Sequence, residues 1–131
     1  MTIAKSATLL LVALAIGGAS TSSVAGRKGT WLSQELAGRI PGTPTDCIDL
    51  SRVDGPMIVD MHTILYRQSG KRIWRMDVGN TCPALREDMV LVIRPSDSRL
   101  CRNDTFQALD RDSRVPSISC RIGQFVPYDR P

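Results

Sequence analysis

The 131-residue sequence lacks the motifs by which common enzyme classes are recognised. It has no Gly-x-Ser-x-Gly motif and no glycine-rich phosphate loop, and its only histidine is His62. A serine hydrolase is therefore poorly supported, because this one histidine would have to serve as the base and has no evident partner to orient it. The length allows one domain of ordinary size and excludes a two-domain enzyme.

Long runs of like charge are also missing. The chain has 17 Lys and Arg residues against 13 Asp and Glu residues, a formal net charge of +4, and the two signs are interspersed, as over residues 86–88 and 110–114. Nucleic-acid binding depends on several basic groups gathered on one face. The charge pattern thus predicts no nucleic-acid partner. With 42% hydrophobic residues and 23% charged residues, the composition is that of a chain that folds.

The first 25 residues have the order expected of a secretory signal peptide. Lys5 precedes an apolar run over residues 7–16, and small residues then lead to the sequence Ser23-Val24-Ala25. The apolar run is shorter than the stretch of about 20 residues that spans a bilayer. We therefore expect cleavage after Ala25 and a periplasmic or secreted protein without a stable membrane span. An uncleaved anchor is the alternative.

Four cysteines would remain after such a cleavage, and they are Cys47, Cys82, Cys101 and Cys120. An even number of cysteines in a small exported chain predicts two disulfides. Four cysteines allow three pairings, and the sequence does not choose among them. The spacing contains no Cys-x-x-Cys pair, which disfavours a zinc site and a thioredoxin-like redox site. We expect the cysteines to have a structural role.

The clearest structural pattern is a β-hairpin over residues 57–78. An apolar run from Met57 to Arg67 is rich in Ile, Val, Thr and Tyr and is followed by polar turn residues over 68–71. Apolar and charged residues then alternate over 74–78, so that Trp74, Met76 and Val78 face a core. Residues 26–45 show little periodicity, and we expect a flexible leader there with room for a short helix over 31–36.

Shorter strands are expected around the hairpin. The candidates cover residues 47–50, 89–93, 105–109 and 118–126, and the continuous apolar run at 89–93 is typical of a buried strand. No long amphipathic helix is present. Five or six short strands predict one all-β domain over residues 46–131, a small antiparallel barrel or sandwich stabilised by two disulfides.

Only one pair of residues suggests chemistry. If residues 57–67 form a strand, Asp60 and His62 share a face and could bind a metal or act as an acid/base pair. Two ligands without a third make a poor metal site, so a solvated or hydrogen-bonded pair is the simpler interpretation. We expect no cofactor. Trp31 and Trp74 could form a binding surface, although Trp74 is better explained by packing in the core.

Several short motifs together resemble an uncharacterised family of small exported bacterial proteins with four cysteines. These motifs are Cys47-Ile48, Asp60-x-x-Thr63-Ile64-Leu65-Tyr66, Gly70, Cys82-Pro83-x-Leu85, Leu100-Cys101-x-x-Asp104 and Cys120-x-Ile122-Gly123-x-Phe125. The resemblance covers Cys47 to Pro127. The family is a domain of unknown function, so the resemblance implies export and paired cysteines and supplies no catalytic residues.

These features predict an exported, disulfide-stabilised β protein that binds a protein or envelope partner without catalysis. Two alternatives stay open. One is an inhibitor of an exported hydrolase such as a lysozyme, which rests on an analogy of size and class. The other is a metal-dependent enzyme that uses Asp60 and His62. The sequence leaves the ligand, the oligomeric state and the presence of any catalytic activity open.

Overall fold

The computed structural model describes residues 25–79, 82–83, 85–117 and 119–131. Within these residues one helix, α1 (Ala25–Leu36), precedes nine strands, and a turn of 3-10 helix, η1 (Leu50–Arg52), follows the second strand. The strands are β1 (Ile40–Pro41), β2 (Cys47–Asp49), β3 (Asp54–Ile58), β4 (Thr63–Gln68), β5 (Arg72–Val78), β6 (Val90–Ile93), β7 (Arg99–Cys101), β8 (Thr105–Leu109) and β9 (Cys120–Asp129). The expected signal peptide lies outside the described residues, apart from Ala25.

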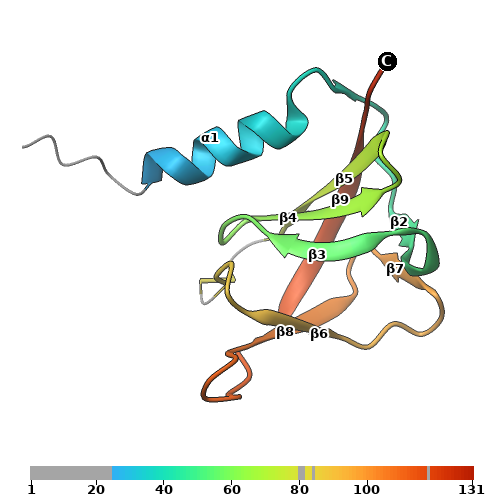
Figure 1. Ribbon diagram of the computed structural model, residues 1–131. Helices are drawn as coiled ribbons and strands as arrows, with labels where there is room; N and C mark the ends of the chain where they lie inside the picture. The colour runs from blue at the N-terminus through green and yellow to red at the C-terminus, as the bar shows by residue number, and fades with distance from the viewer. Residues whose placement is uncertain (1–24, 80–81, 84, 118) are drawn as a thin grey trace, which may run out of the picture.

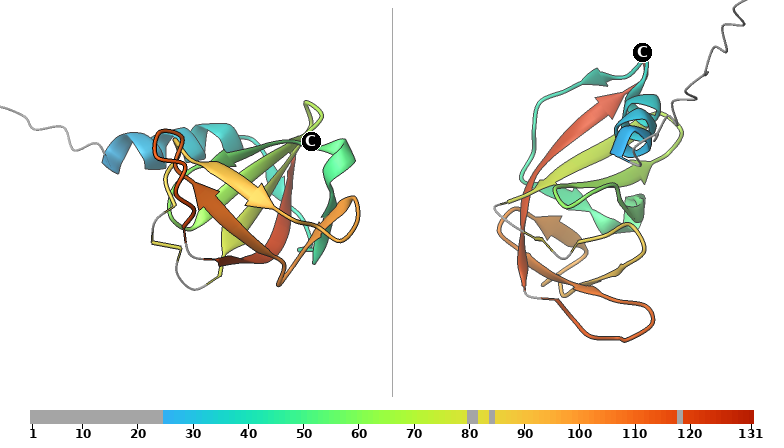
Figure 2. Two further views of the ribbon diagram at one scale, coloured as in Figure 1. Left: turned by 90° about the horizontal axis from the view of Figure 1, so that it is seen from below. Right: turned by 90° about the vertical axis from the view of Figure 1, so that its left-hand side faces the viewer.

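The strands form an antiparallel sheet that curls into a nearly closed barrel (Figure 1). The strand order is β3-β4-β5-β9-β8-β6, β1 also pairs with β9, and β2 and β7 form a separate two-stranded ribbon. The long strand β9 joins the two halves of the barrel (Figure 2), because its start pairs with β8 and its later part pairs with β5. The predicted all-β class is confirmed. Of the two expected arrangements, a barrel or a sandwich, the structure has the barrel-like one.

The predicted hairpin is present in β4 and β5, but its first strand is shorter than expected. Trp74 and Met76 are buried, as the alternating pattern predicts. The apolar run from Met57 to Arg67 was expected as one strand, which is wrong, since β3 ends and β4 begins within it. The break lies at Asp60, whose carboxylate accepts hydrogen bonds from the backbone N–H groups that follow it and so closes a turn.

The sheet is buried on both faces around β4. Ile64 and Tyr66 point into the barrel and join the main core, whereas Leu65 points outward, and all three side chains are almost fully buried. Leu65 belongs to a second, smaller cluster with Val59 and Ile73. Helix α1 lies over this outer face and supplies the apolar cover.

Residues 26–45 were expected to form a flexible leader with room for a short helix over 31–36, and the structure has helix α1 over those positions and β1 after it. Trp31, Leu32 and Leu36 of α1 pack against the outer cluster, and β1 pairs with the end of β9. The sequence indicated only the later half of this helix, because short helices are stabilised mainly by tertiary packing and much less by their own propensity. Among the described residues, no helix is long and apolar enough to cross a bilayer.

Strand β6 is an edge strand, whereas the sequence pattern predicted a buried one. Among the described strands it pairs only with β8. Val90 and Val92 are 43% and 37% exposed, while Leu91 and Ile93 pack partly against the main core. The continuous apolar run was misleading because none of the described elements covers the outer face of this strand.

Candidate functional site

Asp60 and His62 lie in the turn between β3 and β4 and do not share a strand face. The Asp60 carboxylate accepts the backbone N–H groups of His62 at 2.7 Å and Thr63 at 2.8 Å. The His62 side chain is exposed, and its backbone oxygen accepts the N–H of Val78 at 2.7 Å. In the part of the chain that the structure describes, no group of three His, Cys, Asp or Glu side chains could hold a metal ion. The arrangement explains Asp60 as a turn residue.

All four cysteines are paired in disulfides, as predicted, and the structure selects one of the three pairings. Cys47 is bonded to Cys101, which joins β2 to β7 within the small ribbon. Cys82 is bonded to Cys120, which ties the segment after β5 to the start of β9. No free cysteine is present, so no thiol is left for nucleophilic or redox chemistry.

Tyr66 is the most strongly perturbed titratable group in the interior. Its ring packs edge-on against Phe125 with the centroids 6.3 Å apart. The hydroxyl is buried and has no hydrogen-bond partner among the described residues. Burial raises the pKa of Tyr66 well above its ordinary value, because the phenolate would be poorly solvated in the core. The side chain is almost fully buried within the main core, so its part is in packing.

A hollow of about 400 Å³ lies between the edge strand β3 and the segment that leads into β6. Its wall combines the edge of β3, the segment that leads into β6, and one side chain of α1. The main apolar lining residues are Trp31, Met57, Ile58 and Met89, with Glu87 and Arg111 as the charged residues. We refer to this hollow, together with the exposed residues Val90 and Val92 of β6, as the seam. It is the best candidate for a binding site among the described residues because it combines apolar side chains with an unpaired strand edge.

The backbone of β6 offers hydrogen-bonding groups to the seam. Leu91 is paired with Ala108 of β8. Ala108 directs its backbone N–H and C=O away from β6 and toward Ser117. Its N–H donates to the Ser117 hydroxyl at 3.0 Å, and its C=O accepts the backbone N–H of Ser117 at 2.7 Å. In an antiparallel pair of this kind the opposite residue also points its backbone groups outward. The N–H and C=O of Leu91 therefore face the free edge, and by alternation so do those of Ile93.

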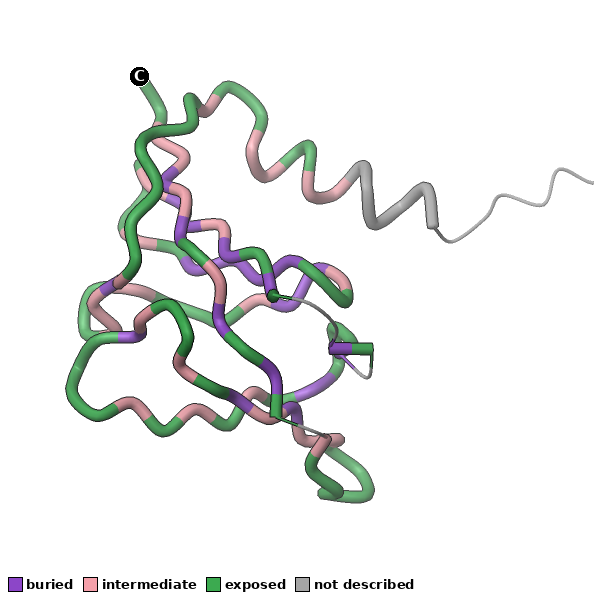
Figure 3. Tube along the Cα trace, turned by 180° about the vertical axis from the view of Figure 1, so that it is seen from behind, coloured by how far each residue is buried: buried purple, intermediate pink, exposed green. Residues whose placement is uncertain are grey.

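A loop over residues 110–116 projects beyond the barrel beside the seam (Figure 2). Its residues from 111 onward are exposed (Figure 3), and Val115 is 63% exposed. Asp110 fixes the loop, since its carboxylate accepts hydrogen bonds from the backbone of Ser113 and Asp112 and pairs with Arg86 at 2.8 Å. The bonds from Ser113 and Asp112 lower the pKa of Asp110. The loop thus has a defined shape at its base.

The seam is not evident from the sequence. Trp31 and Trp74 were expected to be able to form a binding surface, yet Trp74 is buried and, of these two residues, only Trp31 lines the hollow. The other lining residues lie in segments far apart in the chain, and Met57 and Met89 each read as part of an apolar strand. Only their positions in the barrel bring them together.

Comparison with known protein families, with curated proteins and with solved structures finds no match for this chain. The seam, the projecting loop and the disulfide framework are therefore interpreted from the chemistry of their own residues.

Proposed function

We propose that this protein acts in the periplasm or outside the cell as a non-catalytic binding protein. Two disulfides support the location because disulfides form and persist in oxidising compartments. The positive residue and short apolar run of the amino-terminal segment are typical of an export signal.

The binding role rests on one observation, the free backbone edge of β6 beside an apolar hollow. A strand edge with unpaired N–H and C=O groups accepts an extended peptide as an added strand. The occupant we propose is an extended segment of a partner polypeptide with apolar side chains at alternate positions. Its backbone would pair with Leu91 and Ile93, and its apolar side chains would contact Met89 and Trp31 in the hollow.

Catalytic alternatives have less support from the residues. A metal-dependent reaction at Asp60 and His62 would need the Asp60 carboxylate, which already accepts two backbone hydrogen bonds in its turn. A third ligand is missing among the described residues. Thiol chemistry would require one disulfide to open. Non-catalytic binding needs none of these changes.

The test is selection of a phage-displayed library of random decapeptides on the purified disulfide-bonded protein. We expect enrichment of peptides with apolar residues at alternate positions. Val92→Lys, which places a charge on the outward face of β6, should weaken binding of the selected peptide about tenfold or more. The matched control Val115→Lys changes an exposed valine of the loop and should leave binding unchanged. Equal loss in both variants, or no enrichment, would overturn the proposal.

The projecting loop favours inhibition of an exported hydrolase as a second candidate function. Arg111 and Arg114 are exposed on it, and glycoside hydrolases such as lysozymes use a pair of carboxylates in their active-site cleft. Asp110 and Asp112 balance these two arginines within residues 110–116, so the complementarity to such a cleft rests on the two exposed guanidinium groups and not on a net charge of the loop. The test measures cell-wall lysis by lysozyme with the protein added. Inhibition should disappear when residues 111–115 are replaced by glycine and serine. It should persist in Val92→Lys, which leaves the loop unchanged. If the unmodified protein does not inhibit lysozyme, this function is excluded.

A further inference from the structure

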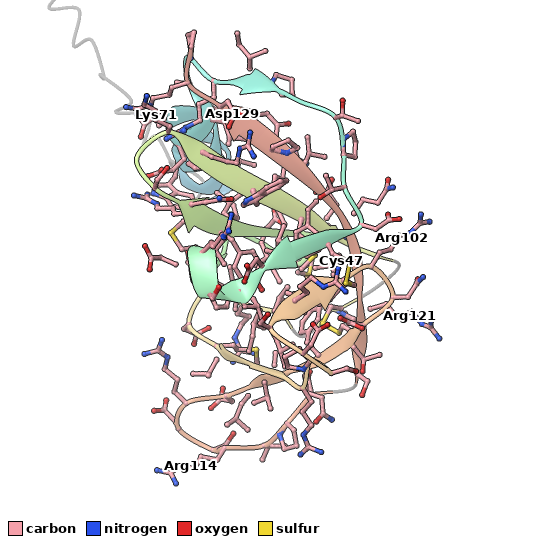
Figure 4. The ribbon with its side chains drawn as sticks, turned by 90° about the vertical axis from the view of Figure 1, so that its right-hand side faces the viewer. Cys47, Lys71, Arg102, Arg114, Arg121 and Asp129 are labelled. Atoms are coloured by element: carbon pink, nitrogen blue, oxygen red, sulfur yellow. A yellow bond between two sulfur atoms is a disulfide. The ribbon has the colours of Figure 1, made fainter. Side chains whose placement is uncertain are left out.

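Basic side chains gather at the end of the barrel where β9 finishes. We call this group the basic end; it comprises the cations Arg39, Arg67, Lys71, Arg72 and Arg130 and the two carboxylates Glu35 and Asp129. Figure 4 shows Lys71 and Asp129 together at this end, beside α1. The described residues carry a net charge of +3, because Lys5 is the only charged residue outside them and the whole chain carries +4. Five cations and two anions account for all of this excess.

The two carboxylates of the basic end are already occupied. Glu35 pairs with Arg67 at 2.7 Å. Asp129 accepts two hydrogen bonds from Arg72, at 2.6 and 2.7 Å, and these bonds lower the pKa of Asp129. The Arg72 guanidinium also lies 5.1 Å from the centre of the Trp74 ring. Both carboxylates are thus already held in ion pairs, although each still acts on the charge of Arg39.

One backbone carbonyl links the three segments that carry Arg39, Lys71 and Arg130. The oxygen of Lys71 accepts the N–H of Arg130 at 3.0 Å and a guanidinium N–H of Arg39 at 2.7 Å. Arg72 of β5 pairs with Asp129 of β9 at the end of their register. Lys71 precedes Arg72 and Arg130 follows Asp129, so Lys71 and Arg130 lie opposite each other. Like charges opposite each other across two strands are destabilising. Within the described part of the chain none of the three side chains forms an ion pair, although Glu35 and Asp129 act on the charge of Arg39 from a greater distance.

The electrostatic environment of Arg39 is consistent with this crowding. Burial lowers the pKa of Arg39, and the nearby charge of Arg130 lowers it further, while Glu35 acts in the opposite direction. Arg67 also lowers this pKa and Asp129 raises it, so two cations oppose two carboxylates around Arg39. A bound anion would add to the effect of the carboxylates.

We propose that Lys71, Arg130 and Arg39 form a binding site for a phosphate-type oxyanion. A hollow of about 370 Å³ is lined by Lys71 and Arg130, and Gln68 and Ser69 supply neutral polar groups to its wall. The paired side chains of Arg72 and Asp129 complete the lining, and Arg39 is tied to it by its bond to the Lys71 oxygen. Lysine provides a point charge and arginine provides several N–H donors in a plane, which is the combination that binds phosphate oxygens. The basic end lies on a different part of the barrel from the seam, so this proposal does not depend on the peptide-binding role.

The first experiment titrates the ¹⁵N-labelled protein with inorganic pyrophosphate at low ionic strength. We expect saturable shifts at Lys71, Arg130 and Arg39, and weaker binding as salt is added. Lys71→Ala and Arg130→Ala should each weaken binding about tenfold, since each removes a charge-assisted contact. The control Arg121→Ala removes an exposed arginine of β9 outside the basic end and should bind as the unmodified protein does.

A second measurement identifies the source of the phosphate group and guards against misfolded variants. Co-sedimentation tests whether the phosphate group belongs to a lipid headgroup. Vesicles that contain phosphatidylglycerol are compared with vesicles of phosphatidylcholine alone. If the protein sediments with the first vesicles and pyrophosphate prevents this, the source is a lipid headgroup. Pyrophosphate binding without sedimentation supports a soluble phosphate. Thermal unfolding should show that Lys71→Ala is folded and that pyrophosphate raises the Tm of the unmodified protein but not of this variant. Shifts spread evenly over the arginines, or equal binding by all variants, would overturn the proposal.

Discussion

Gly123 of β9 lies so close to the carbonyl oxygen of Asp77 in β5 that a β-carbon at position 123 would collide with it. The register of the two strands shifts at this point, so the close approach belongs to the bend of the barrel. We predict that Gly123→Ala destabilises the protein by about 2–3 kcal/mol in urea unfolding, because backbone must move to admit a methyl group. Gly70→Ala is the control, since its methyl group would meet no atom within 4 Å, and it should change stability by less than about 0.5 kcal/mol. Similar losses in both variants would contradict this explanation.

The unsatisfied hydroxyl of Tyr66 predicts a stabilising substitution. Tyr66→Phe removes the buried hydroxyl and keeps the ring that packs against Phe125. We expect the free energy of unfolding to rise by about 1 kcal/mol, because the cost of burying an unpaired polar group is removed. A loss of stability in urea unfolding would mean that the hydroxyl contributes a favourable interaction.

The same residue predicts a pH dependence. Burial raises the pKa of Tyr66 above the ordinary value of 10.0, so the folded protein keeps the phenolic proton at pH values where the unfolded chain loses it. The contribution of this group to stability is complete below about pH 10 and falls as the pH rises further. Tyr66→Phe lacks this loss, so its advantage over the unmodified protein should grow between about pH 10 and about pH 11.5. A constant difference over that interval would contradict the effect.

Each disulfide is expected to contribute substantially to stability. The bonded cysteines are 54 and 38 positions apart, and closing loops of this length in the unfolded chain stabilises the fold by about 4 kcal/mol per bridge. Replacing Cys47 and Cys101 together by serine, or Cys82 and Cys120 together, should therefore lower the free energy of unfolding by that amount. Peptide mass spectrometry without reductant should find these two pairings and no others. A reductant that leaves the urea midpoint unchanged would contradict the structural role.

The free edge of β6 predicts an alternating pattern of amide hydrogen exchange. Leu91 and Ile93 direct their N–H groups away from β8, whereas Val90 and Val92 direct theirs toward it. In the protein without a partner, the amides of Val90 and Val92 should exchange slowly and those of Leu91 and Ile93 much faster. Slow exchange at all four amides would show that another segment or a second copy covers the edge.

Local patterns in the sequence were sufficient to predict part of the fold. The alternation over residues 74–78 identified the inward face of β5, and the strand expected at 105–109 is β8 with the same bounds. The even number of cysteines predicted two disulfides. These features depend on neighbouring residues or on composition, so they can be read along the chain.

The rest depends on contacts between distant residues. Helix α1 is stabilised where Trp31 meets the outer face of β4 and β5, and nothing within the helix itself indicates that surface. The exposure of Val92 follows from the position of β6 at the end of the sheet order. Asp60 was considered for metal chemistry because a strand was expected, and its role as a turn residue depends on the N–H groups that meet it in the fold. The seam could not be predicted for the same reason.

The most direct test of the binding role is amide hydrogen exchange of the protein with a decapeptide selected on it. The account predicts that the amides of Leu91 and Ile93 become protected on binding, because the peptide adds a strand to β6. The Val92→Lys protein should show no such protection at the same peptide concentration. Protection confined to the loop at residues 110–116, or unchanged exchange at Leu91 and Ile93 with the peptide bound, would contradict the claim that the seam is the binding site.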